Sequence, residues 1–220
     1  MIEKMIVYFI TDSSFGKHEI LAEKALRGGV KAIQFREKRM SSREMYYVAK
    51  RLRAITRDYD ALLFINDRVD IALAVDADGV HVGKEDLPAF AIKEFFNGYV
   101  GVTVRSVEEA KEVERFADYL GVGPVFATKV KRDLKPIGIE GLKRVVNAVN
   151  IPVIAIGGIN AENAEEVFKT GVAGIAVISA IAAERDVENS ARRLVETALE
   201  LKRKYKRNRA ENTCENHRSF

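Results

Sequence analysis

Two patterns of apolar residues alternate along almost the whole chain. Short, nearly continuous apolar runs, typical of strands buried on both faces, are each followed by a segment with apolar residues at helical spacing. The predicted strands span residues 5–11, 31–35, 62–65, 79–82, 99–102, 119–121, 152–156 and 173–177. The predicted helices span residues 17–26, 42–58, 69–75, 89–96, 139–149, 161–170 and 187–204, with a further helix opening at Ser106.

Strands and helices in strict alternation predict an α/β fold with a parallel sheet. Eight strand and helix units without a hairpin signal favour a single (β/α)8 TIM barrel, and an open, doubly wound sheet is the alternative. The helix over 42–58 is introduced by Ser41 with Glu44 three residues later, which is capping-box spacing. We expect a catalytic domain over residues 1–205 and a polar, disordered tail over residues 206–220.

Charged residues directly follow the third and fourth predicted strands. The third strand ends at Asn66-Asp67-Arg68, and the fourth ends at a short segment that contains Asp86. Because the carboxyl ends of parallel strands meet at one end of a barrel, Asp67 and Asp86 can share one divalent cation, which prefers hard oxygen ligands. The alternative is that each carboxylate caps the helix after it, since a helix N-terminus favours negative charge.

In the second predicted strand, successive side chains point to opposite faces. Ile33 and Phe35 belong to the apolar face, so Gln34, Arg36 and Lys38 should face the barrel mouth. Burying cations without a counter-charge costs roughly several kcal/mol, so an anion must accompany them. This anion is a polyanionic ligand or, as the alternative, one of the two carboxylates named above. Gln34 is the sole glutamine of the chain, and its amide can both donate to and accept from a heterocycle.

A second candidate anion site follows the last two predicted strands. A glycine pair that ends at Gly158 follows the seventh strand, and Ile178-Ser179 follows the eighth. Barrels often hold a phosphate at this position through backbone N–H groups, although a glycine pair also suits an ordinary tight turn. The basic loop that begins at Thr128 and contains Lys131 lies between the two candidate sites in the sequence; its alternative is a solvated surface loop.

The formal net charge of +4 comes mainly from the C-terminal end. Seven of the 36 basic residues but only two of the 32 acidic residues lie from Lys202 onward, so the rest of the chain is nearly neutral and we expect no nucleic-acid partner. One cysteine, Cys214, and the lack of a signal peptide or a long apolar run predict a cytoplasmic protein without membrane contact. We expect small-molecule substrates, and a homodimer is compatible with the sequence.

Several familiar catalytic motifs are missing from the sequence. It contains no GxSxG elbow, no HExxH, no paired cysteines for zinc and no P-loop. What it offers is a carboxylate pair, a cationic pocket, a backbone phosphate pocket and no evident nucleophile. This set suits a reaction in which a metal-bound anion is the leaving group and a second, phosphorylated substrate supplies the attacking atom.

Taken together, these segments resemble the thiamine-phosphate synthase family. The matches are Gln34-Phe-Arg36-Glu-Lys38, Ile65-Asn66-Asp67-Arg68, His81-Val-Gly83-Lys-Glu-Asp86, Gly123-Pro-Val-Phe-Ala-Thr128, Lys131, Ile156-Gly157-Gly158-Ile159 and Val177-Ile178-Ser179-Ala180-Ile181. The resemblance implies a TIM-barrel transferase of thiamine biosynthesis that uses Mg²⁺. Such an enzyme joins hydroxymethylpyrimidine diphosphate to thiazole phosphate and releases thiamine phosphate and diphosphate. The family's reaction expels diphosphate first, and the thiazole nitrogen then captures a pyrimidine carbocation.

The resemblance also implies a role for each matching residue. Asp67 and Asp86 would hold the magnesium ion, and Gln34 would contact the pyrimidine. The residues implied for the diphosphate are Arg36, Lys38, Asn66 and Lys131. Those implied for the thiazole phosphate are Thr128, Gly158, Ile178 and Ser179. Those implied in catalysis are Arg36, Lys38, Thr103 and Lys131, with Thr103 also in contact with substrate.

The chain departs from the family pattern at four positions. Lys84 replaces a frequent glutamine, Thr103 replaces the usual serine near the reacting centre, and Arg105 stands where histidine is common. Val130 replaces the second threonine of the Thr-x-Thr-Lys pattern. None of these changes removes a residue implied for the metal or the diphosphate. The role of His81, on the inner face of the fourth strand, is open between a ligand contact and a structural hydrogen bond.

Two other functions are compatible with such a barrel. A thiazole tautomerase shares the fold and the phosphate pocket but has no need of a metal and diphosphate cage. A non-catalytic phosphate-binding barrel is the third interpretation. The combination of cations and carboxylates at the mouth argues against the tautomerase, and a turnover assay distinguishes the third.

Overall fold

Eight parallel strands close into a barrel in sequence order, with β8 paired to β1. The computed structural model describes residues 1–128 and 135–216, with side chains up to residue 205. The strands are β1 (Val7–Thr11), β2 (Ala32–Phe35), β3 (Leu62–Asn66), β4 (Gly79–Val82), β5 (Tyr99–Val104), β6 (Tyr119–Val122), β7 (Val153–Ile156) and β8 (Gly174–Val177). The predicted (β/α)8 barrel is therefore confirmed, and the open sheet is wrong.

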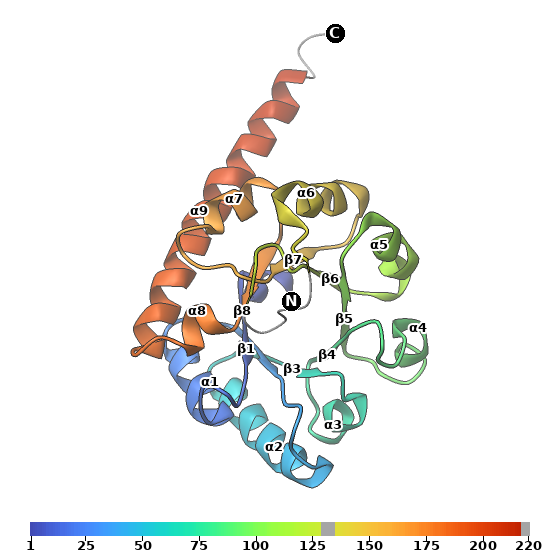
Figure 1. Cartoon of the computed structure of the whole chain (residues 1–220), viewed down its shortest axis with the longest axis vertical. Coiled ribbons are helices and arrows are strands. Elements are labelled where there is room, and N and C mark those ends of the chain that lie inside the picture. The colour runs from blue at the N-terminus through green and yellow to red at the C-terminus, as the bar shows by residue number, and fades with distance from the viewer. Residues whose placement is uncertain (129–134, 217–220) are drawn as a thin grey trace.

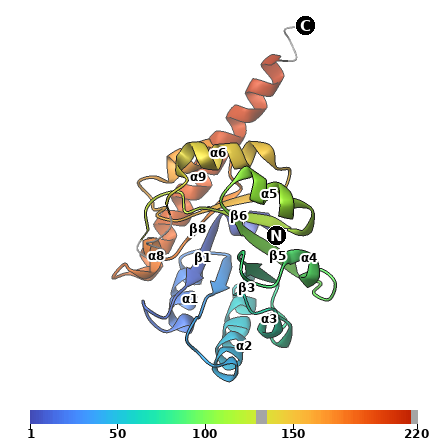
Figure 2. The ribbon, with the colours of Figure 1, turned by 45° about the vertical axis from the view of Figure 1, so that its right-hand side comes forward.

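Helices surround this barrel on all sides (Figure 1). They are α1 (His18–Arg27), α2 (Ser42–Asp58), α3 (Val69–Ala74), α4 (Ala89–Ile92), α5 (Val107–Val113), α6 (Gly138–Ala148), α7 (Ala164–Lys169), α8 (Ser179–Ala182) and α9 (Val187–Asn216), with the 3-10 helices η1 (Ile2–Met5) and η2 (Glu114–Phe116). In the turned view, the strands lie between α1, α2 and α3 on one side and α5 and α6 on the other (Figure 2).

The barrel contains two apolar layers that follow the alternation of side chains. Ile33 and Phe35 belong to the layer between strands and helices. Ala32, Tyr8 and their neighbours belong to a separate cluster inside the barrel. The inner parity predicted for the second strand is therefore confirmed, and it carries the polar side chains of β2 toward the barrel axis.

Glycines on two inner positions make room for large polar rings inside the barrel. A Cβ atom added at Gly101 would lie 2.1 Å from Cζ of Tyr119, and one added at Gly121 would lie 2.8 Å from Cε1 of His81. Neither approach is sterically allowed. The strand glycines thus permit His81 and Tyr119 to share the barrel interior.

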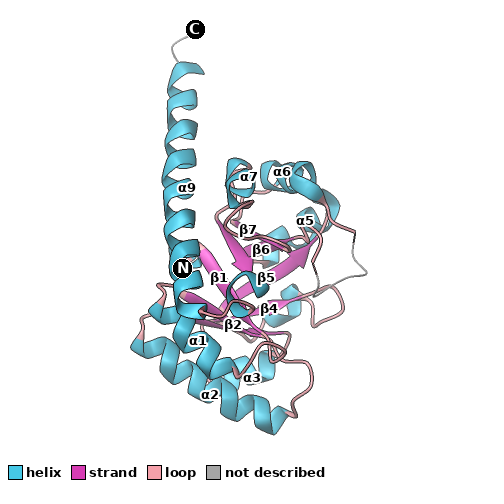
Figure 3. Cartoon of the chain, turned by 60° about the vertical axis from the view of Figure 1, so that its left-hand side comes forward, coloured by secondary structure: helices cyan, strands magenta, loops and turns pink. Residues whose placement is uncertain are grey.

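The positions at which helices end differ from the sequence prediction more than the bounds of the strands do. The capping box of Ser41 and Glu44 is present at the start of α2, as predicted. In contrast, α9 was predicted to end at residue 204, but it continues to Asn216 and projects well beyond the barrel (Figure 3). The sequence of residues 206–216 has no apolar periodicity, so it does not predict where the helix ends, and the disorder of this tail stays a prediction. No helix in the described part of the chain has the length and apolar character needed to cross a membrane.

Candidate active site

A cavity of about 460 Å³ opens at the carboxyl end of the barrel. Its walls come from the ends of the strands and the loops that follow them, which is where barrels carry their chemistry. The predicted site residues that line it are Gln34, Arg36, Asn66, Thr103, Thr128, Gly158, Ile178 and Ser179. Lys38, Asp67 and Asp86 do not line it: Asp67 and Asp86 directly follow the lining residues Asn66 and Glu85, and Lys38 donates to Asp67. Lys131 falls outside the described residues, as does Val130.

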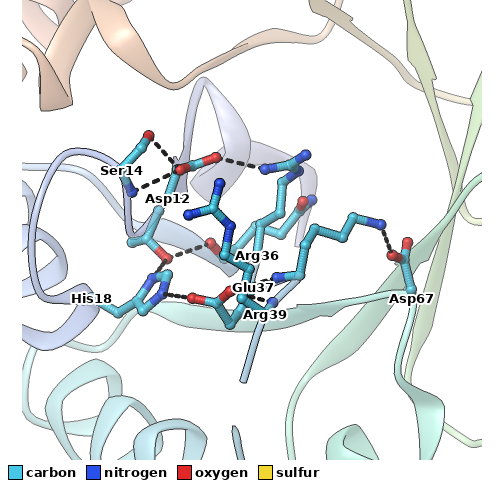
Figure 4. A network of polar contacts seen from close by, with 10 residues as sticks. Asp12, Ser14, His18, Arg36, Glu37, Arg39 and Asp67 are labelled. Atoms are coloured by element: carbon cyan, nitrogen blue, oxygen red, sulfur yellow. Dashed lines mark hydrogen bonds and ion pairs between the residues drawn. The ribbon is translucent and has the colours of Figure 1, made fainter. Parts of the chain in front are cut away.

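The first cation of the cavity, Arg36, is paired with a residue that the sequence analysis did not select. Its guanidinium Nη1 donates to Oδ2 of Asp12 at 2.6 Å, and both side chains are largely buried. The backbone N–H and the hydroxyl of Ser14 also donate to Asp12, at 3.0 and 2.6 Å (Figure 4). Burial raises the pKa of Asp12, but these hydrogen bonds and the charge of Arg36 outweigh it and lower the pKa. Asp67 or Asp86 is therefore the wrong partner for Arg36, but the alternative of internal ion pairing is confirmed for both cations, since Lys38 pairs with Asp67.

The second cation, Lys38, donates through Nζ to the carboxylate of Asp67 (Figure 4). Asp67 has a left-handed backbone with φ of 61°, a conformation that is uncommon for residues other than glycine. Its backbone N–H donates to the carbonyl oxygen of His81 at 2.9 Å, which ties the end of β3 to β4. Such a backbone persists only where its surroundings hold it, and it frequently marks a functional position.

Asp86 lies close to Asp67 at the same rim. Its Oδ2 accepts a hydrogen bond from the backbone N–H of Gly83 at 2.7 Å. Burial and the neighbouring carboxylate of Asp67 raise the pKa of Asp86 above its ordinary value. Neither carboxylate caps a helix, because the N-cap residues of α3 and α4 are Arg68 and Pro88, and neither helix has a side-chain cap. The capping alternative is therefore wrong for both residues.

These two carboxylates fit a magnesium ion, although they do not form a complete protein cage. Among the described residues, no group of three or more His, Cys, Asp or Glu side chains can hold a metal ion. Mg²⁺ is usually bound by one or two carboxylates together with substrate phosphate oxygens and waters. Two mutually repelling carboxylates, Asp67 and Asp86, form the kind of oxygen pair that such a cation relieves.

A chain of hydrogen bonds crosses the barrel interior below the cavity. Nε2 of Gln34 donates to the Tyr8 hydroxyl at 2.9 Å, and the Tyr119 hydroxyl donates to the same oxygen at 3.2 Å. His81 contacts the Tyr119 hydroxyl through Nδ1 at 3.0 Å and Thr103 through Nε2 at 2.8 Å. Burial raises the pKa of both tyrosines well above the ordinary value, so both stay protonated. These hydrogen bonds therefore connect Gln34 with Thr103 through Tyr8, Tyr119 and His81.

The glycine pair after β7 packs tightly against the segment after β6. Gly157 and Gly158 have φ values of 101° and 69°, and a Cβ atom added at Gly158 would lie 2.6 Å from the carbonyl oxygen of Ala127. A side chain is therefore excluded at this position. Ser179 begins α8 and lines the same cavity.

The profile of the thiamine monophosphate synthase family matches residues 7–181, which span all eight strands. The chain belongs to this family.

Proteins that are similar to this chain in sequence and in structure carry the same family name. The thiamine-phosphate synthase of Archaeoglobus fulgidus is 67% identical over 198 residues, which cover 89% of this chain and 94% of that protein. The thiamine-phosphate synthase of Pyrococcus furiosus is 52% identical over 152 residues, which cover 68% of this chain and 73% of that protein. A solved structure of thiamine phosphate pyrophosphorylase from Pyrococcus furiosus has a TM-score of 0.86 and 50% identity, covering 91% of this chain and 98% of that chain.

In this member of the thiamine monophosphate synthase family, the sequence analysis assigned no site role to several residues near the cavity, among them Arg105, which it named only as a departure from the family pattern. Asp12 directly follows β1, so the strand-end rule would have found it had it been applied to the first strand. Tyr8 and Tyr119 lie on the inner parity of their strands, but aromatic residues there suggest only core packing. Arg105 lines the cavity and donates to the carbonyl oxygen of Lys135 at 3.0 Å, a contact between loops that no local pattern predicts.

Proposed function

We propose that this chain is a thiamine-phosphate synthase, which joins hydroxymethylpyrimidine diphosphate to thiazole phosphate and releases thiamine phosphate and diphosphate. The observation that supports this most directly is one cavity lined both by Arg36 and Asn66 and by Gly158 and Ser179. Such a cavity can bring two anionic substrates together. Family membership supplies the identity of the substrates.

The cationic rim would receive the diphosphate. We assign Arg36, Lys38, Asn66 and Lys131 to this group. In the protein alone, Arg36 donates to Asp12 and Lys38 donates to Asp67. Both side chains can turn their remaining N–H donors toward a diphosphate without leaving an unpaired charge in the protein.

Asp67 and Asp86 would hold Mg²⁺ beside the diphosphate. Magnesium, when bound, would neutralise charge that develops on the diphosphate as it leaves. The raised pKa of Asp86 reflects its proximity to a second carboxylate as well as burial, and this proximity supports the assignment of both residues to one ion.

The pyrimidine would be held by Gln34, with Thr103 close to the reacting carbon. The bond between the pyrimidine methylene carbon and the diphosphate oxygen breaks, and both electrons leave with the oxygen. The thiazole nitrogen then donates its lone pair to that carbon. Because the nitrogen attacks directly, no side chain has to act as a nucleophile, which agrees with the absence of a nucleophile motif in the sequence.

The thiazole phosphate would lie in the same cavity, beside the segments that follow the carboxyl ends of β6, β7 and β8. We assign Thr128, Gly158, Ile178 and Ser179 to it. The positive φ angles of the glycine pair hold its backbone in a turn that no side chain obstructs, so N–H groups can approach a phosphate closely. A phosphate there would leave the thiazole ring free to face the pyrimidine.

The thiazole tautomerase would have no use for a metal and diphosphate cage, so the combination of Arg36 and Lys38 with Asp67 and Asp86 favours the synthase. We also propose that the protein is cytoplasmic and forms a homodimer, and that a catalytic domain of residues 1–205 is followed by a tail.

A turnover assay tests the proposed function. The purified chain is incubated with both substrates and magnesium, and thiamine phosphate is sought by mass spectrometry; a parallel reaction contains EDTA instead of magnesium. We expect product only with magnesium. If no product forms although both substrates bind, the synthase assignment is wrong and the non-catalytic barrel is favoured.

A further inference from the structure

A buried carboxylate lies between the two cations of the cavity rim but faces away from the cavity. Glu37 is only 7% exposed, and the side chains on either side of it, Arg36 and Lys38, reach toward the mouth. Along β2 and the residues after it, every second side chain points away from the barrel axis. Ile33 and Phe35 do so and pack beneath the helices, and Glu37 is the next residue in this series. A carboxylate in this apolar layer needs partners, because an unpaired buried charge is costly.

The partner from the helix layer is His18, the first residue of α1. Its ring is 1% exposed, and Nε2 lies 3.1 Å from Oε2 of Glu37 (Figure 4). A carboxylate only accepts hydrogen bonds, so Nε2 carries a hydrogen and donates it. The other ring nitrogen, Nδ1, contacts the hydroxyl of Thr11 at 2.8 Å, and that hydroxyl donates to the carbonyl oxygen of Gln34 at 3.2 Å. His18 is thus held between β1 and β2.

The second oxygen of Glu37 holds the backbone of its own loop. Oε1 accepts hydrogen bonds from the backbone N–H groups of Lys38 at 2.6 Å and Arg39 at 2.7 Å. Burial raises the pKa of Glu37, but the bonds from His18, Ser13 and these two N–H groups outweigh it and lower the pKa to about 2. The carboxylate is therefore ionised and uses both oxygens.

We propose that Glu37, paired with His18, positions the loop that presents Arg36 and Lys38 to the diphosphate. This inference rests on the proposed function of the cavity. The carboxylate fixes the backbone on the side opposite the cavity, so the neighbouring side chains leave the loop toward the mouth. His18 also keeps the negative charge of Glu37 away from the rim, where it would compete with the diphosphate for the two cations.

Removal of the carboxylate should weaken diphosphate binding selectively. The binding constants of inorganic diphosphate with magnesium and of thiazole phosphate are measured by calorimetry for the wild type and for Glu37→Ala. We expect diphosphate affinity to fall about 10- to 100-fold, the usual cost of losing a residue that orients binding groups. Thiazole phosphate affinity should stay within about twofold, because its proposed site belongs to other strands.

Two further variants separate positioning from a general loss of structure. Glu37→Gln keeps an acceptor for the loop N–H groups and should recover part of the lost affinity. Glu44→Ala removes another carboxylate that accepts a backbone N–H, that of Ser41 at 2.8 Å, and should leave both affinities unchanged. In ¹H NMR spectra, the Nε2–H signal of His18 should shift or disappear in Glu37→Gln but persist in Glu44→Ala.

The outcomes distinguish this inference from the proposed function. If the wild type binds diphosphate and Glu37→Ala binds it equally well, the positioning role is wrong and the function stands. If Glu37→Ala loses affinity for both ligands to the same extent, Glu37 has a general structural role, and the inference is also wrong. If the wild type itself fails to bind diphosphate, the proposed function fails. Should Glu37→Ala not fold, Glu37→Gln and His18→Gln decide by the same comparison of the two ligands.

Discussion

The guanidinium of Arg36 and the carboxylate of Asp12 form an ion pair of 2.6 Å between the ends of β2 and β1. Because Ser14 also donates to Asp12, the carboxylate is held in place and in turn orients Arg36. A diphosphate that binds to Arg36 must either share the guanidinium with Asp12 or displace it. The strength of this pair therefore affects both the stability of the protein and the affinity of the ligand.

Asp12→Asn should lower the free energy of unfolding by about 1 to 2 kcal/mol, since it removes a partly buried, charge-assisted hydrogen bond. Inorganic diphosphate with magnesium should then raise the melting temperature of the variant more than that of the wild type, because Arg36 no longer has to leave a carboxylate. Differential scanning calorimetry measures both effects. Asp76→Asn, which removes the exposed pair with Arg57, is the control and should change neither. If diphosphate with magnesium raises the melting temperatures of the wild type and of Asp12→Asn equally, Asp12 and diphosphate do not compete for Arg36.

Asp67→Ala or Asp86→Ala should reduce turnover by about 100-fold or more without unfolding the chain. The loss of a metal ligand should exceed the effect of its orienting partners, which is about 10- to 100-fold. Initial rates are measured over a range of magnesium concentrations, and circular dichroism checks the fold. Full activity of either variant at limiting magnesium would show that the ion is not bound jointly by the two residues.

The stability of the protein should depend on pH through Glu37. Its pKa is lowered from the ordinary 4.5 to about 2 in the folded protein, so the folded state favours the carboxylate. The resulting stabilisation, about 3 kcal/mol at about 1.4 kcal/mol per pKa unit, is present above pH 4.5 and is lost as the pH falls toward 2. Urea unfolding at several pH values should therefore show the wild type losing its advantage over Glu37→Gln in acid. A constant difference between the two proteins from neutral pH to acid would contradict this origin.

Thr103→Val should lower kcat by about tenfold, whereas Thr103→Ser should stay within about threefold of the wild type. The valine removes the hydroxyl that lies 2.8 Å from Nε2 of His81, and a buried polar group that loses a partner costs about 1 to 3 kcal/mol. The serine keeps that hydroxyl. Steady-state kinetics with both substrates tests this, and equal rates for the two variants would mean that the hydroxyl has no role.

Val130→Thr should lower the Michaelis constant for thiazole phosphate by roughly three- to tenfold. Valine has the shape of threonine but offers no hydroxyl, and one hydrogen bond to a charged group contributes about 1.5 to 3 kcal/mol at most. Position 130 falls outside the described residues, so this prediction comes from the sequence alone. The constant for the pyrimidine diphosphate should stay nearly unchanged; an effect on that constant alone would place residue 130 beside the other substrate.

The barrel, the inner direction of Gln34 and the clustering of charged strand ends could all be predicted from the sequence, because each follows from a periodicity that short stretches of chain display. A strand that alternates Ile33, Gln34 and Phe35 has only one way to bury its apolar face. Which charged side chains pair with each other could not be predicted, because the pairing depends on how distant segments pack. Arg36 pairs with Asp12 and Glu37 with His18 because β1, β2 and α1 approach each other in space, and nothing in the local pattern distinguishes these carboxylates from Asp67 or Asp86. The end of α9 also escaped prediction, because residues 206–216 lack the apolar spacing from which a helix is predicted.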